Sequence, residues 1–490
     1  MQGMSRLTMR IRFVIILMAL LAWPLTSSQA ADIALPEIGD SAGALISPQQ
    51  EYRIGQAFFW RLQQSVDLVE DPEINHYIKS IGQRLVSYSD GPALPFKFFM
   101  VPDTTVNAFA APGGFIGVNA GLLLTSQEED ELASVLAHEI AHVTQRHLLR
   151  SIEKHQQGSI PRAAALLGAA LLAAVNPEAG IAALTVVQAS GVQSQIDHTR
   201  AHEAEADNLG MLNLVRSGFD AQAMPTFFER LQQTSRFYSG RSVPEFLRTH
   251  PVTTSRIAEA RSRAVTYPQN RVVRDDLSFY LMRERLRVMT TLNLIDLRQH
   301  YVNVIEKGNN RNTIATRYGY SLALSAMGEY GKARREINVL IADDKERLTY
   351  QLALAEIEKA SGRLSEALKI YQVNQQLYPN DYALSVKQAI VLMQMRNPEK
   401  ASTLLLTQLE AGRGSAQLYK LLAQAQGDMG ETSNAHGWLG EYYYSAGRFK
   451  QSEEQFKLAV KSARGDQYQL AKLNSRLREV EETKVLMEEL

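Results

Sequence analysis

The sequence contains no cysteine among its 490 residues. This absence excludes a disulfide framework, a cysteine nucleophile, a thiolate metal site and a lipoprotein anchor on cysteine. An excess of charge is also missing: 52 basic residues face 52 acidic ones, so no basic field favours nucleic acid as a partner. With 45% hydrophobic residues, the chain can still bury large cores, and its length suggests roughly two to four domains.

Uninterrupted apolar runs long enough for a membrane span of about 20 residues are lacking too. Three arginines precede the run Phe13–Leu25, and Ser28-Gln29-Ala30 follows it, which is typical of a cleaved secretory signal. We therefore expect a signal peptide over residues 1–30 and no transmembrane anchor. A second apolar stretch, residues 163–187, is interrupted by Asn176-Pro177. It predicts two helices packed on the core, with a surface for substrate or lipid as the alternative.

The most informative motif is His138-Glu139-Ile140-Ala141-His142. Histidines at positions i and i+4 of a helix share one face, so both imidazoles can reach one metal ion. Glu139, directly after the first histidine, can hold a metal-bound water and take its proton. The alternative is a core helix with two hydrogen-bonded histidines. It is disfavoured because burying this set without a cation would be costly.

The surrounding sequence predicts that this motif lies on a helix. Ser126-Gln127-Glu128-Glu129 has the pattern of a capping box, and residues 132–149 contain neither proline nor glycine. Leu132, Val135 and Ile140 recur at helical spacing and should form a buried stripe. We therefore expect one continuous helix through residue 149.

A third metal ligand is expected from the segment that begins at Arg200. Glu203 and Asp207 are four residues apart and share a helix face. We predict that Glu203 binds one zinc ion together with His138 and His142, while Asp207 accepts the outer N–H of a ligating histidine. His202 and Glu205 are competing ligands by composition, but they point to other sides of the helix.

Together these motifs resemble the signature of the HExxH/ExxAD zinc metallopeptidase family that includes the CAAX-prenyl endopeptidases. The second motif of that signature is matched by Arg200-x-x-Glu203-x-x-Ala206-Asp207, with Thr199 in place of the usual serine. Residues 107–123 are similar to the family's strand and turn before the zinc helix, and His250-Pro251 resembles its downstream block. The likeness extends from about residue 54 to residue 264.

A small sheet is expected beside the zinc helix, because residues 96–101 and 115–118 are short, β-rich and separated by proline and glycine. In a zinc peptidase an exposed sheet edge can pair with an extended substrate. The candidate edge strand consists of Phe115, Ile116, Gly117 and Val118. An ordinary hairpin in the core is the alternative.

His250 follows a stretch that contains glycine and serine and suggests a loop. The resemblance places it near the active site, where a loop imidazole could occupy the fourth zinc position and silence the enzyme. It could instead donate to the developing oxyanion. A loop histidine bonded to backbone is the third possibility. We favour the first, a latch that must move before substrate binds.

The C-terminal part carries a 34-residue period, the length of a tetratricopeptide repeat. Small residues recur at this spacing as Ala333, Ala367, Ala401 and Ala435. Such repeats stack helix pairs into a solenoid with a concave binding surface.

The sequence therefore predicts an α+β zinc metallopeptidase domain, mostly helical with a small sheet, followed by an all-α tetratricopeptide solenoid. We expect the signal peptide at residues 1–30, the peptidase at 31–267, linking helices at 268–310 and the repeats at 311–490. The resemblance is to family members that combine these two parts in the Gram-negative periplasm. It implies a periplasmic endopeptidase acting on outer-membrane β-barrel proteins, with their assembly machinery as partner and only peripheral membrane contact. The alternative is a periplasmic chaperone or scaffold with a latent peptidase, although a pure scaffold has no need of Glu139.

Overall fold

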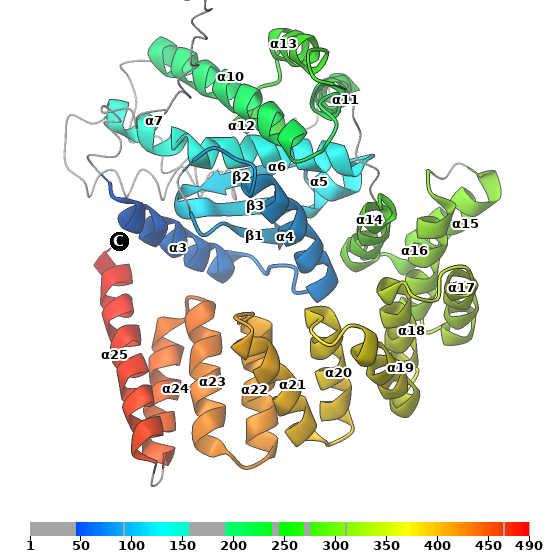
Figure 1. Cartoon of the computed structure of the whole chain (residues 1–490), viewed down its shortest axis with the longest axis vertical. Helices are drawn as coiled ribbons and strands as arrows, with labels where there is room; N and C mark the ends of the chain where they lie inside the picture. The colour runs from blue at the N-terminus through cyan, green and yellow to red at the C-terminus, as the bar shows by residue number, and fades with distance from the viewer. Residues whose placement is uncertain are drawn as a thin grey trace, which may run out of the picture. The chain divides into compact units, whose positions relative to one another are not determined.

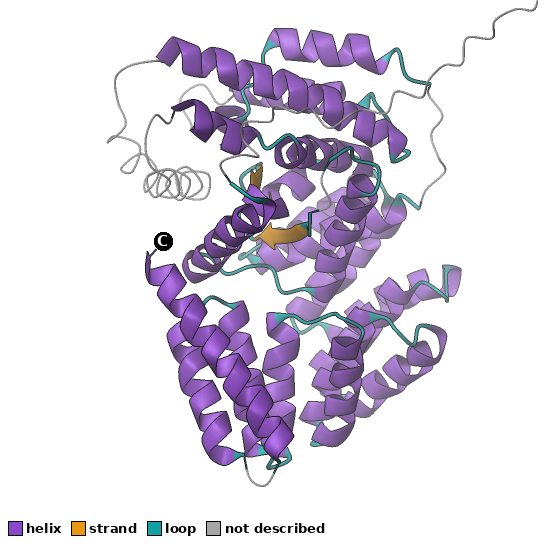
Figure 2. Ribbon diagram, turned by 60° about the vertical axis from the view of Figure 1, so that its left-hand side comes forward, coloured by secondary structure: helices purple, strands orange, loops and turns teal. Residues whose placement is uncertain are grey.

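The computed structural model describes residues 46–91, 94–155, 192–237, 245–268, 275–308, 311–463 and 466–489. The predicted signal peptide and the apolar stretch 163–187 lie outside these ranges. Helices dominate the described chain, and one small sheet lies among those of its first half (Figure 1, Figure 2). No helix in the described ranges combines the length and the apolar character needed to cross a bilayer. The predicted fold class is confirmed.

The predicted peptidase domain contains the sheet and the helices that surround it. Two of these helices begin at well-defined caps: Ser47 forms a capping box with Gln50, and the Asp71 carboxylate accepts from the N–H groups of Glu73 and Ile74. The helices of this part are α3 (Pro48–Ser65), α4 (Pro72–Val86), α5 (Ala120–Thr125), α6 (Glu129–Thr144), α7 (His147–His155), α10 (Val192–Arg216), α11 (Ala223–Phe237), α12 (Glu245–Thr249) and α13 (Thr254–Ala264).

The sheet has three strands, β1 (Lys97–Val101), β2 (Ala108–Ala111) and β3 (Phe115–Asn119), in the order β1-β3-β2. β1 runs parallel to β3, and β2 runs antiparallel to it through a turn at Gly113 and Gly114. The prediction that Phe115–Val118 is an edge strand is therefore wrong. β3 is the central strand, and all of its residues are buried. β2 forms the edge.

Two predictions about the zinc helix are also wrong. The N-cap of α6 is Glu128, without a side-chain cap, and the Ser126 hydroxyl instead donates to the Leu122 carbonyl at the end of α5. The helix does not continue to residue 149, because it ends at Thr144 and α7 starts at His147. Arg146 causes this break with a left-handed φ of 51°. Its guanidinium holds the conformation through Glu51, at 3.0 Å.

The second half of the chain is a series of helix pairs. They are preceded by α14 (Leu277–Thr290) and α15 (Leu294–Lys307). The pairs consist of α16 (Thr313–Ala326) and α17 (Tyr330–Asp343), α18 (Leu348–Ala360) and α19 (Leu364–Leu377), α20 (Tyr382–Gln394) and α21 (Pro398–Glu410), α22 (Ala416–Asp428) and α23 (Thr432–Ser445), and α24 (Phe449–Ser462) and α25 (Gln467–Glu489).

The predicted repeat register agrees with these pairs. Ala333, Ala367 and Ala401 are fully buried near the start of the second helix of their pairs, where a small side chain lets two helices approach closely. The tight turn between paired helices needs a left-handed residue, which is usually glycine. Arg396 takes this place in the third repeat, with a φ of 56°.

A continuous hydrophobic core joins the peptidase helices to the first repeats. It includes Leu136 of α6, Phe279 of α14 and Tyr350 of α18. Buried charges cross the same boundary, since Arg285 of α14 contacts Asp71 at 2.7 Å and Glu356 at 3.0 Å. The domain limits at residues 267 and 310 stay predictions. Packing does not separate the chain there.

Candidate active site and metal centre

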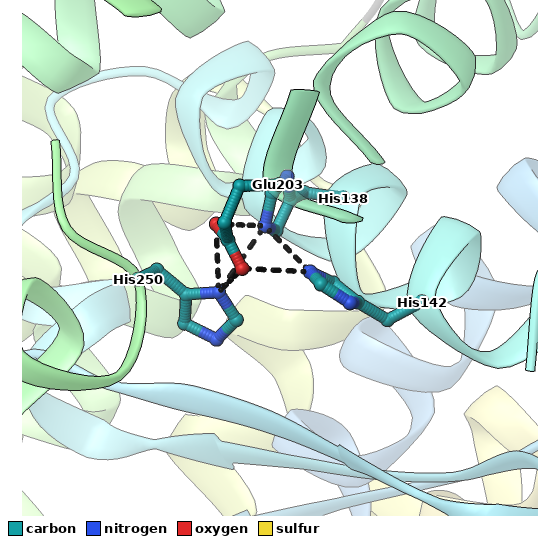
Figure 3. Close-up of side chains that lie close together, drawn as sticks. All are labelled: His138, His142, Glu203 and His250. Atoms are coloured by element: carbon teal, nitrogen blue, oxygen red, sulfur yellow. Dashed lines mark hydrogen bonds and ion pairs between the residues drawn. The ribbon is translucent and has the colours of Figure 1, made fainter. Parts of the chain in front are cut away.

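Four predicted residues from three places in the sequence meet at one point. His138 and His142 come from one face of α6, Glu203 comes from α10, and His250 directly follows α12 (Figure 3). Their ligand atoms all lie within 4.8 Å of one another. α10 can approach α6 this closely because of Gly210, where an added Cβ would lie 3.1 Å from the His138 backbone.

Most of the distances within this metal-site cluster suit a single metal ion. His138 Nε2 lies 3.0 Å from His142 Nε2 and 3.3 Å from His250 Nδ1. Glu203 carboxylate oxygens lie 3.4 Å from both α6 imidazoles and 3.0 Å from His250. Zinc bonds of about 2.0–2.2 Å place neighbouring ligand atoms about 3.4 Å apart in a tetrahedron. The four side chains are thus close enough together to bind one metal ion.

Asp207 lies directly behind His138. Its Oδ1 is 3.0 Å from His138 Nδ1, the nitrogen that points away from the cluster. Arg256 fixes this carboxylate with two hydrogen bonds of 2.7 and 2.8 Å, and it also contacts Glu203 at 2.9 Å. Sequence reasoning gave Arg256 no role in the site. The available signal was its position in the same block as His250-Pro251.

Burial and neighbouring carboxylates shift the pKa values of the two α6 histidines in opposite directions. Burial lowers the pKa of His138, but hydrogen bonds to Asp207 and Glu203 outweigh this effect and raise it to about 10. Burial dominates for His142 and lowers its pKa to about 4. Glu203 is also buried, yet the three surrounding histidines hold its pKa well below the usual value. The cluster therefore contains an ionised carboxylate poised for a cation.

Glu139 points into the same region and is 1% exposed. Burial raises the pKa of its carboxyl above the usual value. Its Oε1 lies 3.5 Å from His250 Nε2. A buried carboxyl group beside a metal site is placed to exchange protons with a bound water.

The two competing ligands lie outside the metal-site cluster. His202 stacks on His147 with ring centroids 4.3 Å apart, and Glu205 contacts His147 at 3.1 Å. His147 in turn lies 2.9 Å from His142, between their Nδ1 atoms. Sequence reasoning missed His147, because a continuous helix would have carried it to another face.

Comparison with known proteins agrees with this geometry. The profile of peptidase family M48 matches residues 72–264. A "Beta-barrel assembly-enhancing protease" from Escherichia coli is 35% identical over 443 residues, which cover 90% of each chain. The chain therefore belongs to peptidase family M48. Its HExxH helix and metal-site cluster are those of an M48 metalloendopeptidase.

Other matches extend over the repeats. The equally named protease of Yersinia pestis is 33% identical and covers 92% of this chain and 94% of its own. The profile of the coatomer epsilon subunit matches residues 324–432. The crystal structure of a tetratricopeptide repeat protein from Parabacteroides merdae aligns with 51% of this chain and 98% of its own, with 13% identity and a TM-score of 0.28.

Proposed function

We propose that this M48 peptidase is a zinc-dependent endopeptidase of the periplasm that acts in assembly and quality control of outer-membrane β-barrel proteins. The metal-site cluster with Glu139 beside it carries the peptidase part of this proposal. The secretion pattern at residues 1–30 supports the location, and the name of the relatives, beta-barrel assembly-enhancing protease, supports the substrates. The helical repeats suit chaperone-like binding of unfolded chains and contact with the assembly machinery.

His138, His142 and Glu203 would hold one zinc ion, and Asp207 would keep His138 in the tautomer that leaves Nε2 free for the metal. Zinc, when bound, polarises the scissile carbonyl and makes water more acidic. Glu139 accepts the proton of the attacking water and later donates it to the leaving amine. The buried carboxyl suits both steps, because its raised pKa lets it hold and release a proton.

The substrate backbone would pair with β2 rather than with β3. β2 is an edge strand that packs beside α6, and Ala110 is partly exposed. Asn107 lies just before this strand and is buried. Its side-chain amide has no hydrogen-bond partner among the described residues. It would orient an extended peptide.

His250 would act as a latch at the fourth zinc position. Four protein ligands close a zinc site, whereas a catalytic site keeps one position open for water. His250 Nδ1 lies 3.0 Å from Glu203 and 3.3 Å from His138 within the metal-site cluster, which supports a latent resting state. Latency also connects this proposal to the alternative function, in which a chaperone or scaffold carries a silent peptidase.

Two substitutions test the peptidase proposal. Glu203→Gln should lose zinc, since it removes an anionic ligand, whereas Glu139→Gln should retain about one zinc per chain and lose proteolysis. Metal content and cleavage of an unfolded β-barrel protein should be measured on the same preparations. Full zinc occupancy in Glu203→Gln would refute the ligand set. Normal barrel assembly by Glu139→Gln in cells without the wild-type protein would favour the scaffold function.

A further inference from the structure

The outer nitrogen of His142 faces a second histidine instead of a carboxylate. His142 Nδ1 lies 2.9 Å from Nδ1 of His147, which is buried. The other ring nitrogen of His147, Nε2, lies 3.1 Å from a carboxylate oxygen of Glu205. Arg150 donates to the same oxygen at 3.0 Å. A row of groups thus runs from the metal-site cluster through two imidazoles to a paired carboxylate.

Metal binding allows only one proton arrangement along this row. If His142 Nε2 faces a metal, its Nδ1 must carry the hydrogen and act as the donor. His147 Nδ1 must then accept, so the hydrogen of the neutral His147 ring lies on Nε2. That N–H donates to Glu205, which can only accept. Each group therefore selects the tautomer of the next one.

The break after α6 is what makes this contact possible. In an uninterrupted helix, residue i+5 lies about 140° around the axis from residue i and cannot face it. The left-handed Arg146 ends α6, and α7 starts again at His147. Arg146 is itself held by Glu51 at 3.0 Å and by the Ile46 carbonyl at 2.8 Å. The strained residue thus turns the chain so that His147 meets His142.

We propose that His147 is a positioning residue that orients His142 for zinc, with Glu205 fixing the tautomer of His147. The proposal rests on the proposed zinc site. In this proposal the outer nitrogens of the two α6 histidines have different partners. His138 contacts the Asp207 carboxylate directly at 3.0 Å, whereas His142 contacts His147, which in turn contacts the Glu205 carboxylate. Partners of this kind contribute about 10- to 100-fold to metal affinity or activity.

A purely packing role for His147 must be distinguished from positioning. The ring stacks on His202 with an interplanar angle of 8°, so any truncation would disturb the core. Three substitutions separate the two roles. His147→Phe keeps an aromatic ring but removes both nitrogens. His147→Asn puts an amide oxygen close to the position of Nδ1, and His147→Gln puts an amide nitrogen close to that of Nε2.

Zinc affinity of the full chain should be measured by competition with a chromogenic chelator. We expect His147→Phe to bind zinc about 10- to 100-fold more weakly than wild type. His147→Asn should regain most of the loss, because it still accepts the His142 N–H, and His147→Gln should not. The visible spectrum of bound cobalt(II) should change in the same order. Thermal unfolding without metal provides the control for packing.

Equal zinc affinity in wild type and His147→Phe would overturn the proposal. So would equal losses in His147→Asn and His147→Gln that follow their losses of thermal stability, since packing would then explain both. Failure of the zinc site itself has a separate signature: wild type would bind no zinc, and Glu203→Gln would change nothing.

Discussion

Arg285→Met tests how strongly the repeats are tied to the peptidase. Arg285 is buried among three carboxylates, at 2.7 Å from Asp71, 3.3 Å from Glu73 and 3.0 Å from Glu356. Methionine fills similar space but carries no charge, so that among the described residues only Lys387 still pairs with Glu73 and Glu356. Removing one partner of a buried ion pair costs about 3–5 kcal/mol. We expect a loss of this size, with a melting temperature lowered by about 3–5 °C for a chain of this length that unfolds as one unit.

The loss should depend on pH in a defined direction. Burial raises the pKa of Asp71 and Glu356, but Arg285 and Lys387 outweigh it and hold both pKa values below normal. Carboxyl groups with lowered pKa stabilise the fold above about pH 4 and lose this contribution as the pH falls. The difference between wild type and Arg285→Met should therefore be fully present from pH 7 down to about pH 4 and shrink as the pH falls further.

Urea unfolding followed by circular dichroism at several pH values measures both effects. Arg216→Met is the matched control, because its pair with Asp90 is exposed at 44% and 73% and should contribute about 0–1 kcal/mol. A loss in Arg285→Met no larger than in this control would refute the reasoning. A loss that grows as the pH falls would refute the charge assignment.

Two further predictions concern the latch and the repeats. His250→Ala should keep zinc bound and raise uncontrolled proteolysis or self-cleavage, measured by fragment analysis. Lower activity with zinc retained would favour the oxyanion role, and no change would leave His250 structural. Arg396→Gly should stabilise the chain by about 0.5–1 kcal/mol in urea unfolding, because it relieves a left-handed side-chain conformation. Gly362→Ala, at φ 80° in the equivalent turn, should do the opposite.

The residues of the metal-site cluster could be predicted because each motif is local. The i, i+4 spacing of His138 and His142 fixes their common face, and the same spacing aligns Glu203 with Asp207. Their meeting across α6 and α10 is a tertiary fact that spacing cannot provide. Resemblance to a family supplied that step. The close approach itself depends on Gly210, which carries no chemical signal in the sequence.

The wrong predictions about the end of α6 and about the edge strand share one physical origin. Both features depend on contacts between residues that are far apart in the sequence. Nothing in residues 132–149 indicates that Arg146 adopts a positive φ, because the contact with Glu51 that holds it spans 95 residues. The order β1-β3-β2 likewise depends on a parallel pairing between β1 and β3. The local pattern marks residues 115–118 as a strand, but it does not show whether that strand has neighbours on both sides.

The boundary near residue 267 illustrates how a division by motif differs from a division by packing. Peptidase motifs end before it and the 34-residue period begins after it, so function changes sharply along the sequence. The core, however, continues from α6 into α14 and α18, and Arg285 and Lys387 neutralise acids on the first turn of α4. A chain ending at Tyr267 would uncover apolar surface and leave buried carboxylates without their cations. Loss of substrate selection in such a fragment would thus report on stability as well as on recognition. Substitutions in the intact chain are therefore the sound way to separate what the repeats recognise from what they hold in place.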